Sequence, residues 1–186
     1  MKRIYSISTA LTFVCATSAF AIDKAAVLDT YANIAAAKYQ DSLVTAQTLQ
    51  AAVNTLLTTP SAETLQSAKE AWLAARIPYQ QTEVYRFGNP IVDDWEGKVN
   101  AWPLDEGLID YVSASYGGPT DENKFAGLNI IANAEFSLSG AQINASAITP
   151  ELLAETLHEA DGVEANVATG YHAIEFLLWG QDLNGH

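Results

Sequence analysis

The sequence predicts an all-α protein, an up-and-down helical bundle interrupted by a long irregular loop that is rich in tryptophan and acidic residues. Three observations support this fold class. Between residues 24 and 57 apolar residues recur at about 3.6-residue intervals, the period of an α-helix. Thr-Pro pairs at residues 59–60 and 149–150 match the N-cap and first position of helices. Strand signals are sparse, because there are no clean alternating runs and no Asn-Gly turn between apolar segments.

Residues 1–21 have the pattern of a secretory signal peptide and are excluded from the fold. Lys2 and Arg3 form a short positively charged N-terminal region, residues 4–16 are apolar, and residues 19–21 form an Ala-Phe-Ala cleavage site. A retained membrane anchor is the alternative, but the apolar run is shorter than the roughly 20 residues of a transmembrane helix. We therefore expect an exported protein, in the periplasm or at the outer face of the cell envelope, with residues 22–186 as one helical-bundle domain.

Cysteine content and charge exclude several kinds of site and partner. The single cysteine, Cys15, lies in the expected signal peptide, so the mature domain has no thiol for a disulfide or a thiolate metal site. The formal net charge of the chain is −13. This acidity argues against nucleic acid and anionic membrane surfaces as partners, because both require basic patches. Solubility alone explains most of the charge, which also raises the local concentration of cations.

Residues 24–57 are expected to form one long amphipathic helix of the kind found in bundles. We expect Thr59 to act as the N-cap of a second helix, with Pro60 as its first residue. This second helix continues to Pro78, which kinks or breaks a helix because it has no N–H to donate.

Beyond Pro78 the helix is expected to continue, which places Glu83 and Arg86 on one face. One interpretation is a kinked core helix with a surface ion pair. The other is that the kink turns Glu83 inward, toward His172 and Glu175 near the C-terminus.

Residues 88–119 contain Gly, Pro, Asn and Asp throughout, so we expect a long irregular loop with a short helix near residues 104–112. Loops of this length are more often functional than plain connectors. Either the tryptophans pin an Ω-like excursion, or the carboxylates complete a cation site, since hard cations prefer carboxylate oxygens. The side chains concerned include Asp93, Asp94, Trp95, Glu96, Trp102 and Asp105.

The segment before the C-terminal helix is less regular. Residues 123–138 show weak helical periodicity, and residues 137–147 are a polar connector. Thr149 and Pro150 are expected to open a helix that reaches Glu159. His158, in this helix, is expected at the surface.

Residues 167–182 predict a helix that carries Ile174, Leu177 and Leu178 toward a core and ends at Gly180. Gly170, near its start, costs about 1 kcal/mol of helix propensity. A glycine is best tolerated there if something must approach the backbone closely.

His172 and Glu175 in this helix are candidate metal ligands. Three-residue spacing places both side chains on one face, with Cβ atoms roughly 5–6 Å apart, so that both can hold one cation. Such a pair is commonly a solvent-facing ion pair instead. Here the flanking residues argue against a solvated face, because they are Tyr171, Ile174, Phe176 and Trp179. A buried glutamate requires a partner or a cation.

Several motifs together resemble the imelysin family. Residues 170–175 match its Gly-x-His-x-x-Glu motif and run on into Phe-Leu-Leu-Trp-Gly-Gln-Asp-Leu-Asn. Two further segments are similar, Ala-Arg-Ile-Pro-Tyr-Gln-Gln-Thr-Glu at residues 75–83 with residues 86–91, and Asp-Trp-Glu-Gly at residues 94–97 with residues 100–106. The resemblance covers most of the chain after residue 70.

The imelysin family includes iron-regulated envelope proteins and is classed with the M75 metallopeptidases. The resemblance therefore implies an iron-related envelope protein. Members of that family are typically longer, with a second helical bundle after the motif helix and a site between the halves. On that comparison this chain is the N-terminal half, and the missing C-terminal bundle of the same protein is an expected partner.

These observations favour an exported metal-binding protein of iron acquisition, with His172, Glu175 and Glu83 as ligands. Arg86 would orient Glu83, and Asp93 or Asp94 could supply a further oxygen. The ligand set suits iron, zinc or manganese, and iron follows from the resemblance. A membrane-bound iron-uptake partner is a further expectation.

Two other functions remain open. An M75-type metallopeptidase needs three protein ligands, an open water position and a general base, and this helix supplies one His and one Glu. Alternatively, the Trp-rich acidic loop binds a peptide, siderophore or polysaccharide without a metal.

Overall fold

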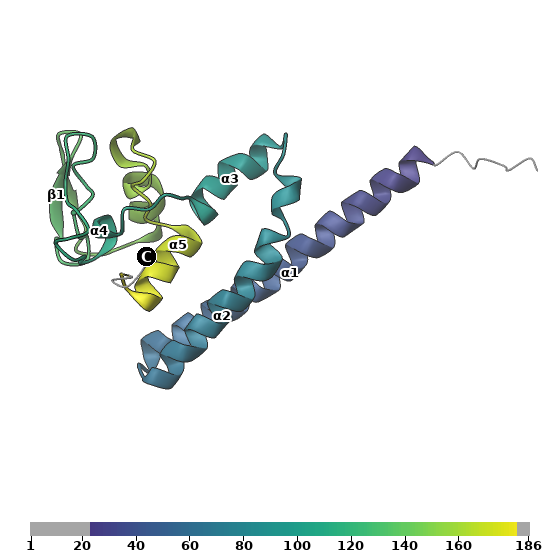
Figure 1. Ribbon diagram of the computed structural model, residues 1–186, viewed down its shortest axis with the longest axis horizontal. Coiled ribbons are helices and arrows are strands. Elements are labelled where there is room, and N and C mark those ends of the chain that lie inside the picture. Colours follow the sequence, from purple (N-terminus) through teal and green to yellow (C-terminus); the bar gives the residue numbers. More distant parts are fainter. Residues whose placement is uncertain (1–22, 182–186) are drawn as a thin grey trace, which may run out of the picture.

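The computed structural model describes residues 23–181, and the expected signal peptide lies outside them. Helices dominate these residues, which confirms the all-α fold class (Figure 1). The main helices are α1 (Lys24–Thr58), α2 (Ala62–Gln80), α3 (Pro90–Asn100), α4 (Glu106–Ile109) and α5 (Gly170–Trp179). Short helical turns are η1 (Glu83–Tyr85), η2 (Leu152–Leu157) and η3 (Ala160–Gly162), and one hairpin comprises β1 (Glu135–Leu138) and β2 (Ala141–Asn144). Within residues 23–181 no helix is both long and apolar enough to cross a membrane.

Helices α1 and α2 form a long antiparallel hairpin, and α5 packs against α2 (Figure 1). The predicted helix over residues 24–57 is confirmed, and Asp23 caps it by accepting a hydrogen bond from the Ala25 N–H at 3.0 Å. The core between the three helices includes Leu49, Trp72, Tyr171 and Leu178. The N-terminal part of α1 extends beyond the rest of the molecule (Figure 1).

The start of α2 differs from the prediction. Ser61, rather than Thr59, is the N-cap. The Ser61 Oγ accepts from the Thr64 N–H at 3.1 Å, and the Thr64 Oγ1 accepts from the Ser61 N–H at 2.9 Å. This reciprocal capping box satisfies two N–H groups, whereas a cap at Thr59 would satisfy one. Pro60 therefore precedes the helix.

The prediction of continued helix beyond Pro78 is also wrong. Helix α2 includes Pro78 and ends two residues later at Gln80. The chain then turns, with the Thr82 N–H bonded to the Tyr79 carbonyl at 2.8 Å, and enters the 3-10 turn η1. A proline removes one helical hydrogen bond, so the helix is weakest at this point.

The segment 88–119 is more regular than predicted. Residues 90–100 form helix α3, with Pro90 in its first turn, so Asp93, Asp94 and Glu96 lie on a helix rather than in a loop. Proline fits a first turn because its missing N–H has no helical partner there. The short helix expected near residues 104–112 is confirmed as α4.

Residues 123–147 form turns and a β-hairpin instead of the expected helix and connector. Strands β1 and β2 pair antiparallel, with Phe136 opposite Ile143. The connecting Ser139 and Gly140 both have positive φ, 50° and 84°, as a type I′ hairpin turn requires. Phe136 packs edge-on against Phe125, and a second core forms beneath the hairpin. Four-residue strands show too little alternation to reveal this arrangement in the sequence.

His158 is buried rather than at the surface. Its side chain is 6% exposed, and its Nδ1 has no hydrogen-bond partner among the described residues. The expected helix ends two residues earlier than predicted, since η2 stops at Leu157 and His158 is extended. Burial lowers the pKa of His158, Lys98 lowers it further, and Glu159 raises it.

This burial predicts acid sensitivity. Below about pH 6.5 the unfolded chain binds a proton at His158 that the folded chain does not, so the free energy of unfolding falls as the pH falls. We expect His158→Gln to flatten that dependence between pH 7 and pH 5 in urea titrations. An equally steep loss of stability in the variant would contradict the prediction.

Candidate metal centre

The first turn of α5 is held by the end of α3. Gly170 has a φ of +86°, and a Cβ placed on it would lie 2.4 Å from the Val99 carbonyl oxygen. The Thr169 hydroxyl donates to the Lys98 carbonyl at 2.8 Å. The close approach inferred at Gly170 is therefore that of the α3 backbone. This contact positions the helix that carries the His-x-x-Glu pair.

The other side of α5 is anchored on α2. The Trp72 indole N–H donates to the Tyr171 carbonyl at 2.9 Å in a buried position. Leu178 is buried as predicted, but Leu177 is exposed, so the prediction that it faces the core is wrong. The helix ends at Gly180, whose φ is +75°, as predicted.

His172 and Glu175 face each other on the α5 surface. The His172 Nδ1 lies 3.0 Å from the Glu175 Oε2, and the two side chains are 18% and 43% exposed. The Trp102 ring packs against the imidazole at a tilt of 56°, with ring centroids 4.9 Å apart. The carboxylate can orient the ring through Nδ1, which leaves Nε2 as the nitrogen for a cation. The alternative is that both side chains bind one cation directly. Imidazole and carboxylate fit iron or zinc.

Glu83 does not join this pair. It lies on η1 with an exposed side chain. Residues 23–181 contain no group of three or more His, Cys, Asp or Glu side chains placed to hold a metal ion. The structure thus brings together two of the three predicted ligands.

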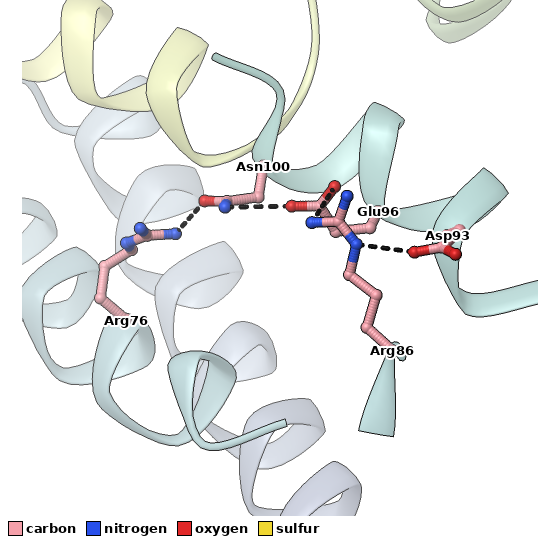
Figure 2. A network of polar contacts seen from close by, with 5 residues as sticks. All are labelled: Arg76, Arg86, Asp93, Glu96 and Asn100. Carbon is pink, nitrogen blue, oxygen red and sulfur yellow. Dashed lines mark hydrogen bonds and ion pairs between the residues drawn. The ribbon is translucent and has the colours of Figure 1, made fainter. Parts of the chain in front are cut away.

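Arg86 contacts α3 rather than Glu83. Its Nε lies 2.7 Å from the Asp93 Oδ1, and its Nη1 lies 3.0 Å from the Glu96 Oε2 (Figure 2). The hydrogen bond to Asp93 raises the pKa of Arg86, with Glu96 adding to the effect. Among the described residues no ion pair joins Arg86 to Glu83. These two ion pairs of Arg86 therefore hold the end of η1 against α3.

The chain of contacts continues to α2. Glu96 is buried and accepts from the Asn100 Nδ2 at 3.2 Å, while the Asn100 Oδ1 accepts from Arg76 (Figure 2). Sequence reasoning gave no role to Arg76 or Asn100, although both lie in the imelysin-like segments. Their polarity beside buried aromatic residues was the available signal.

The remaining predicted neighbours of the site are dispersed. Asp94 is exposed on α3, and Trp95 lies with its ring 6.2 Å from that of Tyr79. Asp105, the residue before α4, accepts a hydrogen bond from Asn123, which lies in the segment between α4 and the hairpin. Of these side chains, only Trp102 contacts His172.

Tyr79 lies beside this network of polar contacts and has a shifted pKa. Burial raises the pKa of Tyr79 above its ordinary range, the negative charges of Glu96 and Glu83 raise it further, and Arg76 lowers it. Tyr79 therefore stays a neutral phenol that packs between α2, α3 and α5.

Comparisons of the sequence with known proteins give its family. The family model of the imelysins, also named peptidase M75, matches residues 35–186. Iron-regulated protein A from Synechococcus elongatus is 32% identical over 79 residues, which cover 42% of this chain and 20% of that protein. The chain thus aligns with about a fifth of the length of this curated relative. The match to the family model extends over most of the sequence, and the chain belongs to the imelysin family.

Proposed function

We propose that this chain is the metal-binding N-terminal part of an exported protein of iron acquisition, with His172 and Glu175 as cation ligands. The observation that supports this most directly is the 3.0 Å contact between the two side chains beside the Trp102 ring. Membership of the imelysin family and similarity to a protein named for iron regulation favour iron over zinc. The apolar run and Ala-Phe-Ala site of residues 1–21 support export.

Two protein ligands do not complete the coordination of iron. A third ligand would come from outside residues 23–181, and we propose the C-terminal bundle of a longer form of the protein as its source. An apolar groove of about 970 Å³ beside α5 is consistent with this arrangement. Leu43 and Leu57 of α1 and Leu177 of α5 line it and are exposed. Helices of the second bundle would cover these leucines. We further propose that a membrane-bound iron-uptake protein receives the metal.

Metal binding without catalysis is the better-supported function. A zinc peptidase requires three protein ligands, a water position and a general base. Helix α5 presents one imidazole and one carboxylate. Peptide cleavage would require all the remaining groups to come from another part of the protein.

The proposal is tested by anaerobic calorimetry with Fe²⁺ and, separately, with Zn²⁺. His172→Ala and Glu175→Gln are expected to weaken the binding of one metal by more than about 100-fold, since even outer-shell partners of ligands contribute roughly 10–100-fold. Asp94→Asn is the matched control, because Asp94 is an exposed acid on α3, and its affinity should equal that of the wild type. Glu83→Gln tests whether Glu83, the third ligand predicted from the sequence, contributes to the metal affinity. Unchanged binding by His172→Ala would exclude the site.

A further inference from the structure

We propose that residues 158–166, which we call the latch, open when the His158 imidazole is protonated, and that this opening frees the start of α5. Metal held at His172 and Glu175 is then released faster as the pH falls. Release of metal rests on the proposed function, whereas opening of the latch is independent of it. Three features of the molecule support the proposal: the enclosed imidazole, the backbone that follows it, and two connections between the latch and α5.

The His158 imidazole is enclosed in a way that suits its neutral form. Its side chain is 6% exposed, and its Nδ1 has no hydrogen-bond partner among residues 23–181. The charged groups that act on it are Glu159, with an oxygen 3.9 Å from Nε2, and Lys98 of α3, which is paired with Glu155 of η2. Protonation makes both ring nitrogens donors, so Nδ1 would carry a charged N–H without an acceptor. The closed latch therefore disfavours the charged ring, which an open latch exposes to water.

The backbone after His158 is held in an unfavourable conformation. Glu159 and Asp161 have positive φ values of 55° and 57°, which residues other than glycine seldom adopt. Such conformations persist only where surrounding contacts hold them. Here the Glu159 N–H donates to the Asn166 carbonyl at 2.8 Å, and the Asn166 Nδ2 donates to the Ala160 carbonyl at 2.8 Å. Loss of packing at His158 would release this backbone toward ordinary conformations.

Two connections join the latch to the start of α5. The first is the hydrogen bond between Glu159 and Asn166, because only residues 167–169 separate Asn166 from the helix. The second passes through Lys98, whose Nζ lies 2.9 Å from the Glu155 Oε1 and whose carbonyl accepts from the Thr169 hydroxyl at 2.8 Å. A displacement of the chain around His158 therefore reaches the residues that hold the first turn of α5.

Proton linkage sets the size of the response. Burial lowers the pKa of His158 in the closed latch, whereas in an open latch the imidazole titrates near its ordinary value of about 6.5. The ratio of open to closed latch therefore rises by up to about tenfold between pH 7.5 and pH 5.5. Release of metal through the open state accelerates by the same factor, since His172 lies in the first turn of α5.

The first test is amide hydrogen exchange of the metal-free protein, followed by NMR at pH 7.5 and pH 5.5 and corrected for the intrinsic pH dependence of exchange. We expect protection of the Glu159 and Asn166 amides to fall by up to about tenfold at the lower pH. In His158→Gln, whose side chain stays neutral, it should not change. The Ala75 amide in the core of α2 is the internal control and should be better protected than both at each pH, because the latch opens without global unfolding.

The second test is the rate at which Fe²⁺ passes from the protein to an excess of a coloured chelator, measured anaerobically by stopped flow at the same two pH values. Protonation of the metal ligands accelerates release in any variant, so the comparison is between wild type and His158→Gln. We expect the acceleration on acidification to be about five- to tenfold greater in the wild type.

Four outcomes count against the proposal. Unchanged protection of the Glu159 and Asn166 amides on acidification overturns the latch, and so does protection equal to that of Ala75. Equal acceleration of Fe²⁺ release in wild type and His158→Gln overturns the coupling to the metal and leaves the proposed function standing. If the wild type binds no Fe²⁺, the proposed function and the release fail together, while amide exchange still decides whether the latch opens. Should His158→Gln fail to fold, His158→Asn takes its place in both tests.

Discussion

Gly170→Ala is expected to lower the free energy of unfolding by about 2 to 5 kcal/mol. About 1–2 kcal/mol comes from the positive φ of +86°, which an L side chain rarely adopts. About 1–3 kcal/mol comes from the new methyl group, which would overlap the Val99 carbonyl oxygen at 2.4 Å and displace backbone. The measurement is urea unfolding followed by tryptophan fluorescence. A loss below about 1 kcal/mol would show that the α3–α5 contact is loose.

Gly97→Ala is the matched control for this prediction. Gly97 lies inside α3, and a Cβ built on it meets no atom within 4 Å. Alanine reduces the conformational freedom of the unfolded chain, so this variant should be more stable by about 0.5–1 kcal/mol. Opposite signs for the two glycine variants would separate steric contact from helix propensity.

Trp72→Ala is expected to reduce the free energy of unfolding by about 3–5 kcal/mol, the usual cost of truncating a buried tryptophan. Trp72 is buried between α1, α2 and α5, and it joins α2 to α5 through the Tyr171 carbonyl. Loss of this ring should also loosen α5 and thereby the His172–Glu175 pair. Thermal unfolding gives the stability, and Fe²⁺ calorimetry gives the effect on the site.

Two variants calibrate the Trp72 result. Trp72→Phe keeps an aromatic ring and removes the indole N–H, so a loss of about 1 kcal/mol is expected. Phe87→Ala truncates a side chain that is 98% exposed and should change stability by less than about 0.5 kcal/mol. A Trp72→Ala loss no larger than that of Phe87→Ala would contradict the described packing.

Local patterns predicted much of the helical structure. The 3.6-residue period of residues 24–57 predicts α1, because residues at that spacing share one face of a helix. The Gly-x-His-x-x-Glu spacing places His172 beside Glu175, since residues three apart on a helix are neighbours whatever surrounds them. The β-hairpin was missed because its strands are four residues long and its turn is Ser139-Gly140.

The residues that surround Glu83 could not be predicted from a local pattern. Their prediction depended on the direction of the chain after Pro78, and contacts between residues distant in the sequence set that direction. The Arg86 ion pairs with Asp93 and Glu96 hold η1 on α3, and Glu83 is left exposed. The burial of His158, whose side chain is 6% exposed, was likewise not evident from its neighbours in the sequence.

By itself the sequence determined the helical class, the motif helix and the adjacency of His172 and Glu175, because each depends on the period of one helix. Only the tertiary structure decided that Trp102 packs against His172, that Gly170 admits the α3 backbone, and that Arg76 lies among three rings and bonds Asn100. The contacts that cross between helices, such as those of Arg76 with Asn100 and of the Trp72 indole with the Tyr171 carbonyl, join residues 24 and 99 positions apart. No local period encodes such pairings, since they arise from the simultaneous packing of α2, α3 and α5.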